Sequence, residues 1–175
     1  CSRDWSSDVC SSDLPRVSAL AVTAALAAGC GQVNSLKGRK AYKDANTAYQ
    51  AQDYKKAADL YQSALTDGGD TPEIQPAYFF LANCLDNLYK PSKKGEATND
   101  ALMENAVKNY QIAAQKLGGT NDENFKKLGK LSLQYLVAAY GSDKLNDPGK
   151  AEPVLQDMIR AEDRKSTRLN SSHGY

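Results

Sequence analysis

Histidine is almost missing from this sequence. The single one, His173, stands near the C-terminal end of the 175-residue chain. A Ser-His-Asp or Cys-His catalytic site, or a histidine metal centre, would therefore have to use that one residue. The carboxylates are interleaved with lysines along the chain, and no pair is placed for general acid-base chemistry. We expect a protein that is not an enzyme.

Cysteine spacing, glycine loops and charge exclude further classes. The four cysteines have neither metal-ligand spacing nor a plausible disulfide framework; they are Cys1, Cys10, Cys30 and Cys84. There is no phosphate-binding glycine loop, because Gly68-Gly69 and Gly118-Gly119 are typical helix ends. Lysine and arginine (22) nearly balance aspartate and glutamate (21), so no basic field favours nucleic acid. We expect no cofactor, no metal and no nucleic-acid partner.

β-branched residues are also few after residue 30, which favours helices over strands. The stretch Ala41–Leu65 predicts two amphipathic helices joined by a tight turn at Gln52-Asp53. The first covers roughly 37–51, and the second, 54–66, is N-capped by Asp53. Gly68-Gly69 should end the second helix in the left-handed conformation.

Similar helix pairs follow along the chain. The second begins near 74–76, with Pro76 in the first turn, and is interrupted by a solvated loop at 90–100 before a helix over 100–117. The third opens with a capping-box pattern at 120–123 and a helix that continues to Tyr140. The last helix begins at Asp147-Pro148, with a cap followed by proline.

These pairs resemble the tetratricopeptide repeat, a helix-turn-helix unit of about 34 residues with small residues where its two helices cross. The first pair carries the resemblance best, with Ala45, Ala57 and Ala64 at the small positions and Tyr61 at an aromatic one. The second matches through Ala82, Ala106, Tyr110 and Ala113, and the third, degenerate, through Ala151, Leu155 and Met158. Ala41 stands where the family favours Trp, and Gly69 where it favours Pro. The resemblance implies an all-α, TPR-like α-solenoid of about six helices over 37–163; the alternative is a generic amphipathic hairpin.

Residues 15–29 are typical of a signal segment. Arg16 supplies a positive charge, and the apolar run 17–28 has the length of a signal-peptide core, too short to span a bilayer. The run ends in LAAGC, which resembles a bacterial lipobox with Cys30 as the lipidated residue; an ordinary apolar helix with a chance cysteine is the alternative. Residues 30–36 would then be a linker. The resemblance implies a lipoprotein of the bacterial envelope, on the periplasmic face of the outer membrane by analogy with enteric bacteria.

The two ends, 1–14 and 164–175, differ from the rest. They are rich in Ser, Arg and Asp and have no hydrophobic period, so they are typical of disordered tails. They also resemble translated sequencing-adapter read-through. In that interpretation Trp5, Cys1, Cys10 and His173 carry no function, and the natural chain continues beyond residue 163.

Candidate binding residues come from the family resemblance. In tetratricopeptide repeats the first helix of each pair lines the concave face, which implies a partner-binding groove made of Arg39, Tyr42, Asn46, Tyr49, Gln50, Phe79, Asn83, Asp86 and Asn87. Asn and Gln can hydrogen-bond the backbone of a peptide, and Tyr supplies stiff contact area. The alternative is that these residues form an exposed polar helix face that binds no ligand. Tyr42 stands where chaperone-tail binders need lysine, which argues against that partner.

The sequence thus predicts a lipid-anchored, non-catalytic scaffold that binds a protein or peptide in the envelope. A glycan- or nutrient-binding lipoprotein of the outer membrane is the alternative. Such proteins need an aromatic platform, and Tyr89, beside the inserted loop, is the one hint of it. Cys84 is expected to be a buried small side chain and no reactive thiol.

Overall fold

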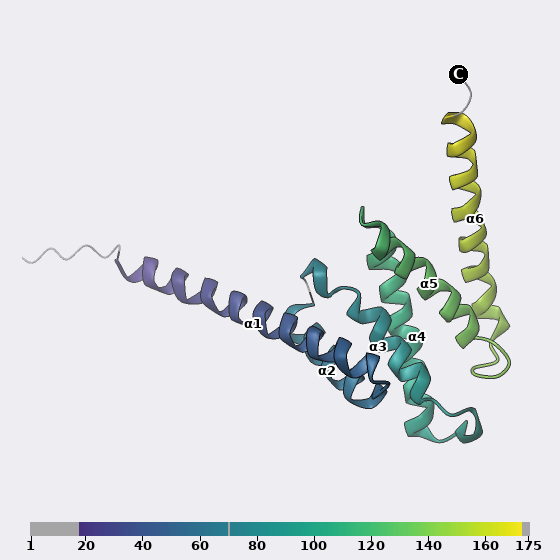
Figure 1. Ribbon diagram of the computed structural model, residues 1–175, viewed down its shortest axis with the longest axis horizontal. Coiled ribbons are helices and arrows are strands. Elements are labelled where there is room, and N and C mark those ends of the chain that lie inside the picture. Colours follow the sequence, from purple (N-terminus) through teal and green to yellow (C-terminus); the bar gives the residue numbers. More distant parts are fainter. Residues whose placement is uncertain (1–17, 70, 173–175) are drawn as a thin grey trace, which may run out of the picture. The chain divides into compact units, whose positions relative to one another are not determined.

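The computed structural model describes residues 18–69 and 71–172, with side chains for 33–69 and 71–160. Every regular element in these ranges is a helix, which confirms the all-α fold class (Figure 1). The α-helices are α1 (Ser18–Gln50), α2 (Tyr54–Gly68), α3 (Ala77–Leu88), α4 (Ala97–Gly118), α5 (Glu123–Ala139) and α6 (Pro148–Ser172), and two short 3-10 turns are η1 (Pro72–Ile74) and η2 (Pro91–Lys93).

Helix α1 begins earlier than the sequence predicts. It is continuous from Ser18, so residues 30–36, expected to be a linker, are helical; they contain no proline that would end a helix. Cys30 lies within this helix, whereas Cys1 and Cys10 fall outside the described residues. The structure divides between Val33 and Asn34, and the packing described below belongs to the second unit. In the described ranges no helix combines the length and apolarity needed to cross a membrane.

The first core joins residues 34–50 of α1 to α2, η1 and α3. Small side chains fill the crossing of α1 and α2: Ala45, Ala57 and Ala64 are all fully buried, as expected for the small positions of a helix pair. Tyr61 fills the space between α2 and α3, with its ring stacked on Phe80 at a centroid distance of 5.7 Å. In this core, small side chains let α1 and α2 approach closely, and aromatic side chains fill the space between α2 and α3.

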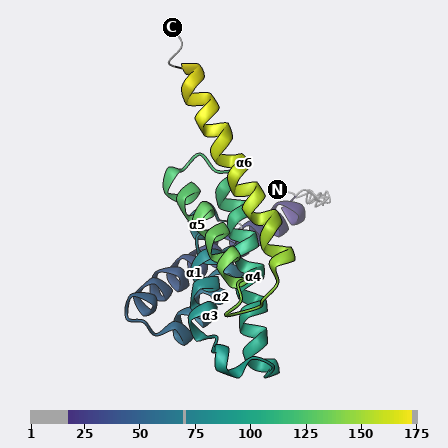
Figure 2. The same cartoon turned by 90° about the vertical axis from the view of Figure 1, so that its right-hand side faces the viewer.

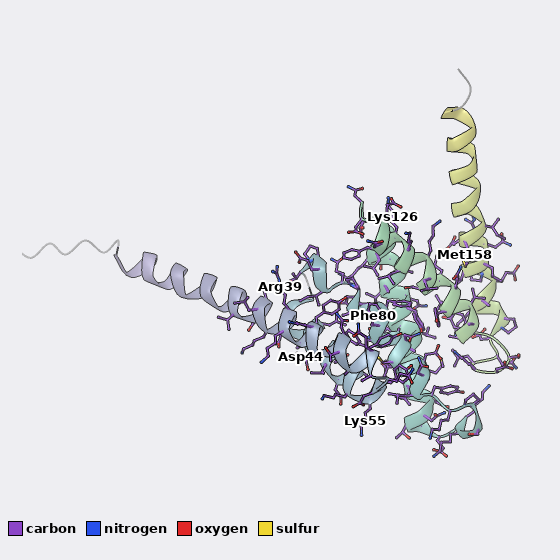
Figure 3. All side chains as sticks on the ribbon, viewed as in Figure 1. Arg39, Asp44, Lys55, Phe80, Lys126 and Met158 are labelled. Atoms are coloured by element: carbon purple, nitrogen blue, oxygen red, sulfur yellow. The ribbon has the colours of Figure 1, made fainter. Side chains whose placement is uncertain are left out.

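The second core joins α3, α4 and α5, and α3 belongs to both cores. Ala77, Leu81 and Cys84 face the first core, whereas Phe79 and Ala82 face the second. Because apolar residues surround α3 on nearly all sides, it has to be buried between neighbours. Figure 1 shows α3 between α2 and α4, and Figure 2 shows the same helices after a 90° turn. Figure 3 shows Phe80 in the middle of the packed helices.

Two glycine contacts set the closest helix approaches. A Cβ on Gly38 of α1 would lie 2.9 Å from the Cα of Gly68, and one on Gly129 of α5 would lie 2.7 Å from the backbone N of Gly118. Glycine is thus required by backbone contact at these crossings. The expected left-handed end of α2 is wrong: Gly69 has φ −59°, and a Cβ there would collide with the carbonyl oxygen of Leu65 at 2.4 Å. Glycine is therefore suited to position 69 because it has no Cβ, and not because it can adopt a positive φ.

Local capping signals place most helix starts. The Asp53 carboxylate accepts a hydrogen bond from the Lys56 amide, and Gln52 completes the turn with φ 60°, as predicted. At α5 the cap is Asp122, whose carboxylate accepts from the amides of Asn124 and Phe125, so the predicted capping box starting at Thr120 is wrong. The Asp122 carboxylate lies next to the first free amides of α5 and accepts their hydrogen bonds, whereas the Thr120 hydroxyl lies two residues earlier.

The remaining boundaries differ more from the sequence prediction. Pro76 is the N-cap of α3 and not a residue of its first turn, and α4 begins at Ala97, which shortens the inserted loop. Helix α6 starts at Pro148 as predicted, but it continues to Ser172 through a stretch expected to be a disordered tail. His173 and Trp5 lie outside the described residues.

Candidate binding cleft

A cleft of about 580 Å³ opens on the side of the helices formed by α1, α3 and α5. It is lined by Tyr49 of α1, Tyr54 of α2, Asn83, Asp86 and Asn87 of α3, Tyr89 and Pro91 after α3, Tyr135 of α5, and Lys144 after α5. Its lining thus comes mainly from alternate helices of the chain. Such a volume is typical of cavities that hold small molecules or short peptide segments.

A hydrogen-bond network fixes one wall of the cleft. The Tyr49 hydroxyl of α1 donates to Asn83 Oδ1 at 2.7 Å, and Asn87 Nδ2 donates to the same oxygen at 3.0 Å. Asn83 Nδ2 in turn donates to the Tyr110 hydroxyl at 3.5 Å. Asn83 is buried, so these bonds satisfy an amide that would otherwise be costly. They also fix the position of α1 and α4 against α3.

An ion pair between Asp86 and Lys144 forms another wall of the cleft. Asp86 Oδ1 accepts from Lys144 Nζ, and Asp86 Oδ2 accepts from the Tyr110 hydroxyl at 3.5 Å. The Asp86 side chain is 8% exposed and the Lys144 side chain 24% exposed. The pair joins α3 to the loop between α5 and α6. Its charges cancel, so the cleft as it stands has no net charge among its described lining residues.

Three tyrosine hydroxyls in the cleft have no hydrogen-bond partner among the described residues. Those of Tyr54, Tyr89 and Tyr135 form no hydrogen bond with any described residue, and yet no buried polar side-chain atom of the described ranges lacks a partner. These hydroxyls must therefore be open to solvent. Tyr89 makes the point most clearly, because its side chain is otherwise buried, with 6% of the residue exposed. The cleft presents donors and acceptors that a ligand can use.

Burial raises the pKa of two phenols and one thiol in this region. Desolvation raises the pKa of Tyr49, and it raises that of Tyr110 further, with the Asp86 charge adding to the effect. Desolvation also raises the pKa of Cys84 to about 12. Cys84 is fully buried, so it is an inert packing residue, as the sequence predicts.

Four of the nine predicted groove residues line the cleft, namely Tyr49, Asn83, Asp86 and Asn87. The others lie elsewhere. Arg39 is exposed and pairs with Glu73 at 3.6 Å, and Asn46 accepts from the Tyr61 hydroxyl at 2.7 Å. Tyr42 packs against the Tyr61 ring, and Gln50 is exposed outside the cleft.

Phe79 was wrongly expected in the groove. It is 4% exposed and packs against the rings of Tyr110 and Tyr135 at centroid distances of 6.0 and 5.8 Å. Its position on α3 points it into the second core. A helix turns by about 100° per residue, so a small error in helical register is enough to exchange a groove position for a core position.

Sequence reasoning missed Tyr54, Pro91, Tyr135 and Lys144, and it gave Tyr89 only a hint of a role. The sequence does contain a signal for Tyr135, because it lies on α5, the first helix of the third pair, and first helices line the inner face in the family that the chain resembles. Lys144 had none, since it lies in a connecting loop. A second, smaller cavity of about 250 Å³ lies between α2 and α4 and is lined in part by Leu65, Tyr78 and Ile112.

In the described part of the chain, no cluster of His, Cys, Asp and Glu could hold a metal ion. Comparison with models of known protein families found no match, and neither did comparison with curated proteins or with solved structures.

Proposed function

We propose that this chain is a non-catalytic scaffold of the tetratricopeptide-repeat type that holds a segment of a partner protein in the α1/α3/α5 cleft. One observation carries the proposal. Residues predicted to face inward on two separate helices, Tyr49 on α1 and Asn83, Asp86 and Asn87 on α3, meet in one cavity. Their amides and phenols suit the backbone and side chains of an extended peptide.

The arrangement of the helices supports the repeat assignment. Helix α1 contacts α2 at Gly38 and Gly68, and from α2 onward each helix packs against the next along the chain. Helix α3 also touches α5, the first helix of the following pair. Small side chains lie at the crossing of α1 and α2, and aromatic ones fill the space toward α3. Stacked helix pairs of this kind present a continuous inner surface.

Membrane attachment through Cys30 is the second part of the proposal. The apolar run and the LAAGC sequence before it support lipidation in a bacterial envelope, on the periplasmic face of the outer membrane. Attachment would raise the effective concentration of the cleft near membrane-bound partners. Palmitate labelling tests this part: label should disappear in Cys30→Ala and persist in the control Cys84→Ala. Label that survives Cys30→Ala contradicts it.

A photo-cross-linking amino acid at position 49 tests the cleft. The expected result is a discrete cross-linked protein in envelope preparations, lost when the bulky, charged Asn87→Arg is added. Asn87 is exposed, so this change should leave the fold intact. The matched control places the cross-linker at position 108, in the cavity between α2 and α4. Equal cross-linking from both positions, or none from position 49, contradicts the proposal.

A saccharide is the second candidate ligand. It is favoured by the partly exposed rings of Tyr49, Tyr54 and Tyr135. The hydroxyls of Tyr54, Tyr89 and Tyr135, which have no partner among the described residues, add hydrogen-bonding groups. Retention on immobilised glycans that falls in Tyr135→Ala, with no protein cross-linked from position 49, would establish this candidate and overturn the protein scaffold.

A further inference from the structure

Asp86 has a buried carboxylate, which is stabilised by a cation, the Lys144 ammonium. Its side chain is only 8% exposed, so its carboxylate has lost most of its hydration. A carboxylate in that position is costly unless a positive charge and hydrogen bonds compensate it. The Tyr110 hydroxyl supplies one hydrogen bond at 3.5 Å, and Lys144 supplies the charge.

The carboxylate is fixed without help from Lys144. Asp86 lies on α3, the helix that is buried between both cores, and Tyr110 holds its second oxygen from α4. Removal of the Lys144 ammonium would therefore leave the Asp86 carboxyl group in place at the cleft.

Lys144, in contrast, contacts Asp86 through the ammonium group at the end of its long side chain. The backbone of its loop is held by its own hydrogen bonds, including Lys144 N to Gly141 O at 3.2 Å and Asn146 N to Gly141 O at 2.8 Å. These bonds do not depend on where the ammonium points. Rotation of a long, flexible side chain is thus enough to vacate Asp86 without moving the loop.

The cleft without the Lys144 ammonium would favour a cation. Asp86 and Lys144 are the only charged groups among the described residues that line it, so its net charge would become −1. The other walls are tyrosine rings and neutral amides, and tyrosine faces attract ammonium groups. About 580 Å³ is room for a lysine side chain together with some flanking backbone.

We propose that Asp86 is the receiving site for a lysine side chain of the partner peptide, and that Lys144 occupies it in the free protein and is displaced on binding. This inference rests on the proposed scaffold function and specifies its ligand. Lys144 then acts as an internal competitor that sets the affinity and rejects partners without a cation. A neutral saccharide would not displace the Lys144 ammonium from Asp86, because it has no positive charge to replace it.

The test uses the full chain and two synthetic probes, acetyl-Gly-Gly-Lys-Gly-Gly-amide and the same peptide with Nε-acetyl-lysine. Lys144→Met removes the competing charge and keeps a long apolar side chain. It should bind the lysine peptide about tenfold more tightly than the unmodified chain does, and should prefer it over the acetylated peptide. Adding Asp86→Asn should abolish that preference. Calorimetry measures binding, and circular dichroism melting verifies that each variant is folded.

The proposal is overturned if folded Lys144→Met gains no affinity for the lysine peptide, or if Asp86→Asn leaves the preference unchanged. Raised salt should weaken binding to Lys144→Met, because the attraction is between charges. Failure of the scaffold function would be visible separately, as loss of the cross-link from position 49. A partner that cross-links there and still binds Asp86→Asn would leave the scaffold standing and reject the lysine site.

Discussion

The first and last helix pairs of this chain are packed in different ways. In the first, α2 places four fully buried or nearly buried small and aromatic side chains against its neighbours: Ala57, Ala58, Tyr61 and Ala64. In the last, no described side chain of α6 is fully buried; Val154 and Met158 are half-buried, and Leu155 and Ile159 are 43% and 54% exposed. The same hydrophobic period therefore leads to burial only where both sides of the helix pair have partners.

This difference teaches that repeat-like spacing alone does not measure stability. Ala57 and Ala151 were assigned the same small position in their pairs, but Ala57 is fully buried and Ala151 is only half-buried. Burial, and not the sequence match, should set the cost of mutation. Four predictions test this comparison.

Tyr61→Ala should have the largest effect. The ring is fully buried, stacks on Phe80, and its hydroxyl donates to Asn46, so its removal should lower the free energy of unfolding by about 3–5 kcal/mol. Urea unfolding followed by circular dichroism gives the value. Met158→Ala in α6 is the matched change in the last pair, and we expect it to cost about 1 kcal/mol or less. Equal losses would break the comparison.

Gly38→Ala should cost about 1–3 kcal/mol, because the new methyl group meets the Gly68 backbone at 2.9 Å and the Ala64 carbonyl oxygen at 3.1 Å. Gly118→Ala is the control, since a Cβ at Gly118 would have no heavy atom within 4 Å. Thermal melting of the two variants measures the difference. If Gly118→Ala destabilises as much as Gly38→Ala does, the loss of stability does not come from contact between the new methyl group and the neighbouring backbone.

Tyr49→Phe should cost about 1 kcal/mol, the usual net value of a lost hydrogen bond, here the 2.7 Å bond that joins α1 to α3. Tyr54→Phe removes a hydroxyl with no described partner, and its free energy of unfolding should be unchanged within experimental error. Denaturant titration of both variants provides the measurement. A loss in Tyr54→Phe equal to that in Tyr49→Phe would mean that the tyrosine hydroxyls of the cleft are structural.

Leu155→Ser should have the smallest effect, within about 0.5 kcal/mol, because the side chain is 43% exposed on α6. The same denaturant titration measures it. A loss of the size expected for Tyr61→Ala would show that α6 has a packing partner in solution, and the contrast between the two helix pairs would then disappear.

The features predicted well from sequence are those with local causes. Asp53 and Asp147 each accept a hydrogen bond from a backbone amide three residues later, so a capping residue in front of an apolar period is enough to find the helix start. The burial of Ala45, Ala106 and Ala113 also follows from spacing, because small residues at a helix crossing recur with the helical period.

The features missed depend on contacts that no local pattern encodes. Gly38 was given no role, and yet its contact with Gly68 sets a helix crossing thirty positions away in the chain. Lys144 was overlooked because loop residues have no period, and its partner Asp86 lies two helices earlier. Phe79 was misplaced because the groove positions were transferred by analogy, whereas the two-sided burial of α3 decides which way its residues point.

The dual membership of α3 has a consequence for how the molecule opens. When one core opens locally, α3 remains packed against the other, so both cores must open before both of its sides are exposed. Its backbone amides should therefore be among the last to exchange with deuterated solvent. The cleft residues Asn83, Asp86 and Asn87 are carried by this slowly exchanging helix, while Lys144 sits in a loop. The Asp86 carboxylate should therefore keep its position during local openings that expose the loop around Lys144.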